Sequence, residues 1–255
     1  MVCLSKPRRA ASLLAAASAA ILGLGACAYN ETLGRSQFLI ADESSLAQQA
    51  DAAWQEALRT QNVVSTPALN ERVRRVGGRI VQAANLGNRP WDYAVFDSAS
   101  PNAFVLPNAK IGVTTGLLNL VRNDDQLAAV LGHEVGHVVA RHAVERYSNT
   151  AVAGGLLQAA QGAAGNRAEA VGALGSLGAQ YGVLLPFSRR DELEADRLGV
   201  DYMAAAGFRP SEAVALWRIM SEQRQGSTPQ FASTHPSDQT RIAALEQYIA
   251  SRGWN

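Results

Sequence analysis

The sequence has few cysteines and almost no net charge, and both absences exclude classes of protein. Its two cysteines, Cys3 and Cys27, cannot form the framework of a disulfide-stabilised scaffold. The 23 basic and 22 acidic residues nearly cancel, and no basic stripe is present, so nothing indicates a nucleic-acid-binding protein. Hydrophobic residues make up 47% of the chain, enough to bury a sizeable core, which excludes global disorder.

The first residues, 1–26, are typical of a lipoprotein signal peptide. Positive charges near Lys6 precede an uncharged run from Ala10 to Leu24, which suits the apolar region of a signal but is too short to span a bilayer comfortably. The run leads into Leu-Gly-Ala-Cys, which looks like a bacterial lipobox in which Cys27 is acylated. An ordinary signal peptide with a small-residue cleavage site is the alternative. Because Ala rather than Asp follows Cys27, resemblance to enterobacterial lipoproteins favours the periplasmic face of the outer membrane.

Beyond the signal we expect a tether at residues 27–38, lipidated at Cys27, and then one domain at residues 39–255. Apolar periodicity predicts that this domain is mainly α-helical. The expected helices are Ser44–Leu58, Leu69–Ala84, Asp124–Tyr147, Ser188–Ala206, Ser211–Glu222 and Ser237–Arg252. A short strand at Tyr93–Phe96, with a hairpin-like pair at residues 103–106 and 110–115, adds a small β-sheet, so the fold class is α+β.

Residues 148–187 are rich in glycine and alanine and lie between two of the predicted helices. Polar residues such as Arg167 interrupt the apolar runs, so the segment is too polar and too broken for a transmembrane helix. Its glycines make it costly to order and easy to move. We therefore expect a loosely helical, mobile cover over the functional site.

The strongest chemical signal is the stretch His133-Glu134-Val135-Gly136-His137. Four helical residues rotate by about 400°, so His133 and His137 lie nearly above one another on one face. This spacing allows both imidazoles to bind one Zn²⁺, with Glu134 within reach of a metal-bound water. Zinc lowers the pKa of that water toward about 7, and the carboxylate can take its proton as it attacks a carbonyl. Gly136 keeps one side of the helix slim, so another element can approach closely.

Such a site needs a third protein ligand, and carboxylates at the start of the helix Ser188–Ala206 are the candidates. Glu192 and Asp196 are four residues apart and share a face, whereas Glu194 points elsewhere. We expect Glu192 to bind the zinc and Asp196 to accept the second N–H of a ligand histidine, which fixes its tautomer. An exposed acidic helix start, favoured by the helix dipole, is the alternative.

His142 needs a separate interpretation, because the chain has only four histidines. It follows His133 by nine residues, about 900° of helical rotation, which places it on the opposite side of the predicted helix. We interpret it as a surface or packing histidine and not as a ligand.

The stretches His133–His137 and Glu192–Asp196 together resemble the HExxH…ExxAD pattern of a gluzincin family of zinc metallopeptidases. That family contains the HtpX heat-shock protease and the CAAX prenyl proteases. Further matching stretches are Pro101–Phe104, Gly112–Leu118 and Ser233–Pro236. The resemblance runs from about Leu33 to the C-terminus. It implies a zincin-like fold, in which the HExxH helix packs against the ExxAD helix, and one zinc ion per chain.

Within this family the chain is most similar to the short periplasmic lipoproteins, of which LoiP and YcaL are examples. Membrane-spanning helices like those of the HtpX and prenyl-protease branches are not expected, nor is the C-terminal TPR extension of the BepA branch. The resemblance implies that His235 either hydrogen-bonds the oxyanion during catalysis or serves as a fourth ligand that holds the enzyme latent. A loop histidine without a role is the alternative. Arg241 is implied to orient the site or to pack beside it.

Two functions are consistent with these residues. The first is a zinc endopeptidase of the bacterial cell envelope that hydrolyses misfolded or outer-membrane proteins, with Glu134 as base and then proton donor. In this interpretation Lys110–Thr115 presents a strand edge on which an extended substrate pairs. The second is a latent or non-catalytic chaperone or assembly factor for outer-membrane proteins, with a structural zinc. A structural zinc does not need Glu134, so its presence favours catalysis.

The expected partners follow from the first function. They are protein or peptide substrates, the outer-membrane assembly machinery, and the membrane itself through the lipid anchor. We also expect a latent resting state, in which the cover at residues 148–187 and His235 together block the open coordination position.

Overall fold

The computed structural model describes residues 27–41, 43–163, 187–223, 231, 235 and 239–254. The expected signal peptide, residues 1–26, and residues 164–186 of the expected cover lie outside these ranges. No helix in the described ranges combines the length and the apolar character that crossing a bilayer requires.

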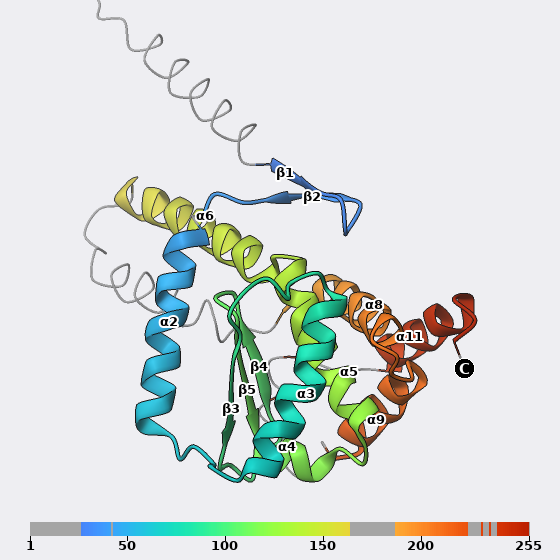
Figure 1. The fold of residues 1–255 in the computed structure, drawn as a ribbon. Helices are drawn as coiled ribbons and strands as arrows, with labels where there is room; N and C mark the ends of the chain where they lie inside the picture. Colours follow the sequence, from blue (N-terminus) through green and yellow to red (C-terminus); the bar gives the residue numbers. More distant parts are fainter. Residues whose placement is uncertain are drawn as a thin grey trace, which may run out of the picture.

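The fold is mainly α-helical with small sheets, which confirms the predicted class. The helices are α2 (Glu43–Thr60), α3 (Pro67–Ala83), α4 (Thr115–Leu120), α5 (Asp124–Val139), α6 (His142–Ala163), α8 (Arg189–Ala205), α9 (Ser211–Gln223) and α11 (Gln239–Ser251). The strands are β1 (Cys27–Asn30), β2 (Arg35–Phe38), β3 (Asp92–Phe96), β4 (Ala103–Leu106) and β5 (Lys110–Thr114). The HExxH helix, α5, packs against the ExxAD helix, α8, as expected (Figure 1).

The main sheet has three strands in the order β3-β5-β4. Strand β5 runs parallel to β3 and antiparallel to β4, so the predicted hairpin pair is confirmed. Our expectation that Lys110–Thr115 offers a free edge to substrate is wrong, because β5 is the central strand and both of its edges are paired. The edge next to α5 belongs to β4.

The two faces of this sheet are covered by different helices, because successive side chains of a strand point to opposite faces. On one face Trp54 of α2 packs edge-on against Phe96 and Phe104, with ring centroids 6.0 and 6.2 Å apart. Phe104 lies across Gly112, where an added Cβ would come within 2.2 Å of its ring. The other face carries Val95 into the main core, which is shared with α3 and α5 (Figure 1).

Helix α5 is the centre of the domain, and every residue from Gln126 to His137 is buried. Its closest neighbour is α8, and small residues line the contact between them. A Cβ on Gly136 would lie 2.8 Å from the carbonyl oxygen of Ala195. One turn away, a Cβ on Gly199 would lie 2.8 Å from the backbone nitrogen of His133. The two backbones therefore touch at the level of the HExxH motif, as the slim side at Gly136 predicted.

The single long helix that we predicted from Asp124 to Tyr147 is wrong, since α5 ends at Val139 and α6 begins at His142. Arg141 between them has a left-handed backbone conformation, with φ of 56°. The carbonyl oxygen of Ala140, which no longer has a helical partner, accepts a hydrogen bond of 2.7 Å from the side chain of Gln37. A contact from a distant segment therefore stabilises a break that the apolar periodicity does not reveal.

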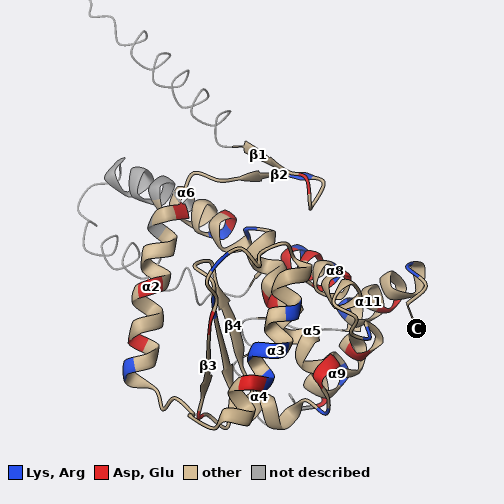
Figure 2. Ribbon diagram, viewed as in Figure 1, with Lys and Arg blue, Asp and Glu red and all other residues tan. Residues whose placement is uncertain are grey.

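Residues 27–38, which we expected to form a tether, form the antiparallel strands β1 and β2. This hairpin lies beside α6 and apart from the three-stranded sheet (Figure 1). Gln37 of β2 is buried, although its segment was expected to serve only as a spacer. Lys and Arg alternate with Asp and Glu along the described helices in the ribbon of Figure 2.

We expect Gly136→Ala to lower the free energy of unfolding by about 1–3 kcal/mol, because the added methyl forces α5 and α8 apart. Chemical denaturation of the metal-free protein measures the change. Gly154→Ala on α6 is the matched control, since nothing lies within 4 Å of its added Cβ. There the usual helix preference for alanine should raise stability by up to about 1 kcal/mol. Equal effects of the two substitutions would contradict the close contact.

Candidate metal centre

The two histidines of the HExxH motif meet inside the domain. Helix α5 places their side chains on one face, with 3.1 Å between His133 Nε2 and His137 Nε2. Both side chains are buried, at 1% and 5% exposure. Two lone pairs directed into one small volume are the arrangement that the i, i+4 spacing predicts for a shared cation.

Glu192 and His235 complete a group of four. Glu192 Oε2 lies 3.4 Å from His133 Nε2, and Glu192 Oε1 lies 3.5 Å from His137 Nε2. His235 Nδ1 lies 2.9 Å from Glu192 Oε1 and 3.2 Å from His133 Nε2. All four ligand atoms are within 4.8 Å of one another. The structure thus brings together all three predicted ligands and the histidine whose role was open.

These separations can be compared with those of a zinc site. Tetrahedral ligands about 2.0–2.2 Å from one zinc ion lie roughly 3.3–3.6 Å from each other. The measured values of 2.9 to 3.5 Å are close to that range. Three imidazoles and one carboxylate are also a donor set that zinc prefers. The buried cluster therefore fits the metal that its residues imply.

A carboxylate and an arginine hold His133 in place. His133 Nδ1 lies 2.9 Å from Asp196 Oδ1, so Nδ1 donates to Asp196 and Nε2 is the nitrogen that faces the cluster. Arg241 bonds Asp196 through Nε at 2.5 Å and Nη2 at 2.8 Å. Its Nη1 is also 2.5 Å from Glu192 Oε2. Arg241 thus connects Asp196, the predicted orienting carboxylate, to Glu192, the predicted ligand. Both Asp196 and Arg241 lie directly beside the cluster.

Glu134 is buried beside the cluster. Its Oε1 is 3.3 Å from His235 Nε2 and forms no hydrogen bond within the described residues. The backbone N–H of Val105 on β4 donates to its carboxylate. Burial raises the pKa of Glu134, although the nearby His235 and His133 act in the opposite direction. A buried carboxylate oxygen without a hydrogen-bond partner is suited to receive a proton from a group that enters the cluster.

Our placement of His142 on the opposite side of the helix is wrong, because the break after Val139 turns this residue inward, where it is a packing histidine. His142 Nδ1 lies 2.9 Å from His137 Nδ1, and His142 Nε2 lies 2.9 Å from Glu194 Oε2. The side chain is 1% exposed. His142 is therefore in direct contact with a predicted ligand, and not on the opposite side of the helix. Glu194 does point away from Glu192, as expected, and its partners are this histidine and Arg35.

Aromatic side chains enclose the cluster, and the sequence contains no local pattern that identifies them. Phe187 stacks on His137 with ring centroids 3.9 Å apart. Phe231 stacks on His235 at 4.7 Å, and Trp217 lies edge-on to His133 at 5.3 Å. They come from separate segments, so only the folded chain brings them together. Residues 233, 234 and 236, which surround His235 in the family motif, lie outside the described residues.

The charges of the buried groups depend on one another. Burial and the charge of Arg241 would lower the pKa of His133, but hydrogen bonds to Asp196 and Glu192 outweigh them and raise it to about 9. Burial holds the pKa of His137 well below its usual value. Burial would raise the pKa of Glu192, but the charge of Arg241 and the hydrogen bonds from the histidines lower it far below its usual range. Without metal, His133 therefore carries the proton and Glu192 the negative charge.

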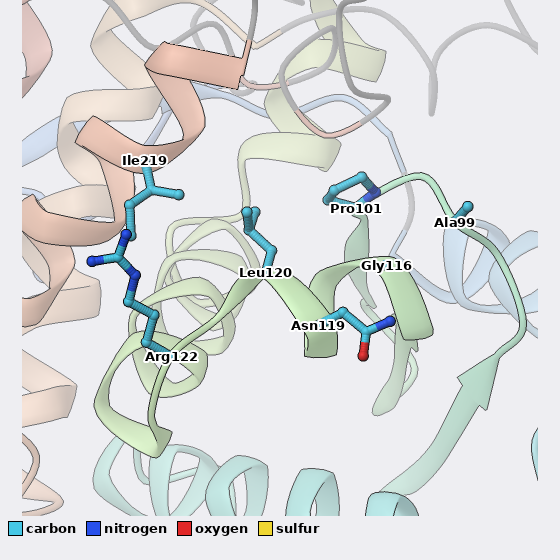
Figure 3. Close-up of a pocket in the computed structure, with 7 residues that line it drawn as sticks. All are labelled: Ala99, Pro101, Gly116, Asn119, Leu120, Arg122 and Ile219. Atoms are coloured by element: carbon cyan, nitrogen blue, oxygen red, sulfur yellow. The ribbon is translucent and has the colours of Figure 1, made fainter.

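A separate hollow lies beside α4, with a volume of about 430 Å³. Its lining residues are Ala99, Pro101, Gly116, Asn119, Leu120, Arg122 and Ile219, shown in Figure 3. None of the four cluster residues lines it. Pro101 directly precedes the segment that enters β4, so the hollow lies at the beginning of the edge strand and not at the cluster.

A family model and several curated relatives match the chain. The model for peptidase family M48 matches residues 67–249. The mitochondrial metalloendopeptidase OMA1 of Schizosaccharomyces pombe is 38% identical over 179 residues, which cover 69% of this chain and 52% of that protein. The mitochondrial metalloendopeptidase OMA1 of Bos taurus is 31% identical over 233 residues, covering 85% of this chain and 45% of that protein.

A bacterial relative is named for a different role. The beta-barrel assembly-enhancing protease of Escherichia coli strain K12 is 28% identical over 192 residues, which cover 71% of this chain and 39% of that protein. The chain therefore spans about half the length, or less, of these relatives. Both groups of relatives are named as peptidases, and only the names of the first group give a compartment, the mitochondrion.

We expect zinc binding at pH 7 to release about one proton per chain. The pKa of His133 is about 9 without metal, so this residue is protonated at pH 7 and must lose its proton to offer Nε2. The competing proton is lost as the pH rises, so zinc affinity should increase roughly tenfold per pH unit from 7 to 8.5. Calorimetric titration in two buffers of different ionisation enthalpy measures the proton release. An affinity that is independent of both pH and buffer would contradict the protonated state of His133.

Proposed function

The chain belongs to peptidase family M48, and from this membership and the geometry of its buried cluster we propose that it is a zinc-dependent endopeptidase. The observation that carries the proposal is Glu134. A site that only stabilises the fold does not need a buried carboxylate with a free oxygen beside four candidate ligands. The name metalloendopeptidase of the relatives and the fit of the donor set to zinc support zinc as the cofactor. In this proposal His133, His137 and Glu192 hold one ion per chain.

Each side chain then has a chemical task. Zinc held by His133, His137 and Glu192 would supply a water with a pKa of about 7 and a Lewis acid for a carbonyl oxygen. Glu134 accepts the proton of the attacking water and later returns it to the nitrogen of the leaving amine. The raised pKa of Glu134 suits a group that must both accept and donate. Asp196 keeps the Nε2 lone pair of His133 directed into the cluster, and Arg241 holds Asp196.

The substrate is an extended peptide that pairs with the edge of β4. The N–H of Val105 faces Glu134 and not β5, so this edge runs along the cluster. An extended segment added there would bring a peptide carbonyl toward Glu134, with backbone hydrogen bonds supplying affinity that depends little on sequence. This mode of binding suits unfolded or misfolded protein chains.

We place the enzyme at the periplasmic face of the bacterial outer membrane, anchored through a lipid on Cys27. The lipobox-like sequence before Cys27 supports this location, and so does the name of the bacterial relative. Misfolded and outer-membrane proteins are then the substrates, and the outer-membrane assembly machinery is a partner. The described residues include Cys27 as an exposed free cysteine, accessible for acylation.

A latent form of the enzyme is the second candidate, supported by the position of His235. Its Nδ1 lies among the other three ligand atoms, and a zinc site closed by four protein ligands lacks the open position that catalysis needs. A chaperone or assembly factor with a purely structural zinc would have the same closed site. The cover at residues 148–187 is also expected to block the open coordination position. Most of it, residues 164–186, lies outside the described part of the chain.

We expect Glu134→Gln to retain zinc and the fold but to reduce peptide cleavage by about 10²–10⁴-fold, because the side chain is nearly isosteric and only the proton acceptor is lost. Cleavage of an unfolded protein substrate and zinc content are measured on the same preparation. Glu56→Gln on the exposed face of α2 is the control and should cleave normally. Cleavage by Glu134→Gln at the control rate would exclude the peptidase mechanism and favour the structural zinc.

We expect His235→Ala to increase basal cleavage several-fold while three ligands retain the metal, because the substitution opens a coordination position. The initial rate on one unfolded substrate, normalised to zinc content, decides the question. A decrease of tenfold or more would instead assign His235 the stabilisation of the oxyanion. An unchanged rate would assign it no role in either form.

A further inference from the structure

We propose that strand β2 is part of the metal centre, because Arg35 clamps a Glu194–His142 pair that orients the ligand His137. In this assignment Arg35, Glu194 and His142 are positioning residues, and none of them touches the metal. The inference rests on the proposed metal site at His133, His137, Glu192 and His235, and it adds a segment of the chain that lies outside the matched family region, residues 67–249.

The directions of the protons follow from one assumption, that His137 offers Nε2 to the metal. Its Nδ1 must then carry the proton and donate to the atom 2.9 Å away, which is His142 Nδ1. His142 therefore accepts at Nδ1 and carries its own proton on Nε2, which donates to Glu194 Oε2 at 2.9 Å. The chain of hydrogen bonds has one consistent direction, from the metal ligand to a carboxylate.

The other ligand histidine is held in the same way, with one fewer step. His133 donates directly to Asp196, and Arg241 holds that carboxylate with two hydrogen bonds. His137 reaches its own carboxylate through His142, because the backbone break before His142 places an imidazole between them. Each ligand histidine thus ends at a carboxylate of α8 that an arginine clamps, and such partners fix the orientation of a metal-bound ring.

Arg35 satisfies the requirements for such a clamp. Its Nε and Nη2 bond the two oxygens of Glu194 at 2.7 and 2.8 Å. Its Nη1 and Nη2 bond the two oxygens of Glu145 at 2.9 Å each. The side chain is 18% exposed, so little solvent competes for these bonds. Two bidentate contacts fix the guanidinium plane, and through it the Glu194 carboxylate, more tightly than a single charge could.

Strand β2 is itself bonded to the C-terminal end of α5. Buried Gln37 donates to the carbonyl oxygen of Ala140 and to Glu145 Oε2, both at 2.7 Å. Farther along, the backbone N–H groups of Ile40 and Ala41 donate to Ser148 Oγ at 3.0 and 3.1 Å. These bonds hold the strand against α6, so Arg35 is presented from a rigid element.

A second metal ion is the competing explanation, since ligand atoms of His142, Asp191 and Glu194 also lie within 4.8 Å of one another. Two arguments oppose a second metal ion at this place. His142 Nε2 carries a proton in the chain derived above, so it has no lone pair for a metal. Both oxygens of Glu194 already accept hydrogen bonds from Arg35, and the guanidinium of Arg190 lies 3.7 Å from Asp191 Oδ1, so the cluster already contains cations.

Zinc retention under chelator competition tests the assignment without using peptidase activity. We expect Glu194→Gln to weaken zinc affinity by about 10–100-fold and Arg35→Ala by about tenfold, with partial recovery in Arg35→Lys, which keeps the charge but loses the bidentate contacts. The cobalt-substituted protein should show a changed visible spectrum in Arg35→Ala and Glu194→Gln, because His137 is no longer held in one orientation. Zinc content should be one ion per chain in the unmodified protein.

Arg72→Ala is the matched control. Arg72 is similarly shielded, at 24% exposure, and bonds Asp124 at the start of the same helix α5, far from the histidines. It should lose stability without changing zinc affinity or the cobalt spectrum. His133→Ala is the second reference and should lose the metal.

The outcomes separate the two proposals. Loss of zinc in His133→Ala, with affinity and spectrum unchanged in both Arg35→Ala and Glu194→Gln, would overturn the positioning role and leave the metal site intact. Normal zinc binding by His133→Ala would overturn the metal site itself. Two zinc ions per chain, with one lost in Glu194→Gln, would replace the clamp by a second site. Folded state is checked by circular dichroism, and Glu194→Gln and Arg35→Lys retain most of the shape if the alanine variant fails to fold.

Discussion

The contact between the backbones of α5 and α8 is the constraint on which the site depends. Neither Gly136 nor Gly199 leaves space for a side chain, since an added Cβ at either position would lie 2.8 Å from backbone atoms of the other helix. At this separation a short carboxylate on α8 reaches an imidazole on α5 directly. A wider spacing would leave charged groups in the core without partners, which costs several kcal/mol for each ion. Packing and chemistry are therefore set by the same small residues.

Helix α8 distributes three carboxylates to three different tasks within five residues. Glu192 faces the cluster, Asp196 faces His133, and Glu194 faces His142 on the other flank. Each is paired with an arginine, so the negative charge needed near a cation is buried without being left uncompensated. The capping box at Ser188 begins the helix immediately before these residues, which fixes their height along its axis.

The residues closest to the chemistry were predictable from the sequence because they obey helical spacing. The pairs His133 with His137 and Glu192 with Asp196 each depend on one local rule, and the structure places them together. The position of His142 depended instead on a helix that continues, and the positive φ of Arg141 breaks it. Gln37, which lies 103 residues before Ala140 in the sequence, stabilises that break with a hydrogen bond. We expected an open edge at β5, but β5 is central and β4 lies at the edge. The reason is the same, because strand order is decided by pairing between distant segments.

The N-terminal hairpin has a mechanical consequence. Arg35 follows Cys27 by only eight residues, and β1 and the turn into β2 occupy that interval. If Cys27 carries lipid, tension between the membrane and the domain would act first on the pairing of β1 with β2 and then on the bonds of Arg35 to Glu194 and Glu145. A proteolytic cut within residues 31–34 would separate β1 from the domain and leave β2 attached, with Gln37 still bonded to Ala140 and Glu145. If Cys27 is lipidated, such a cut would detach the domain while Arg35 keeps its bonds to Glu194 and Glu145, so detachment alone would leave the orientation of His137 unchanged.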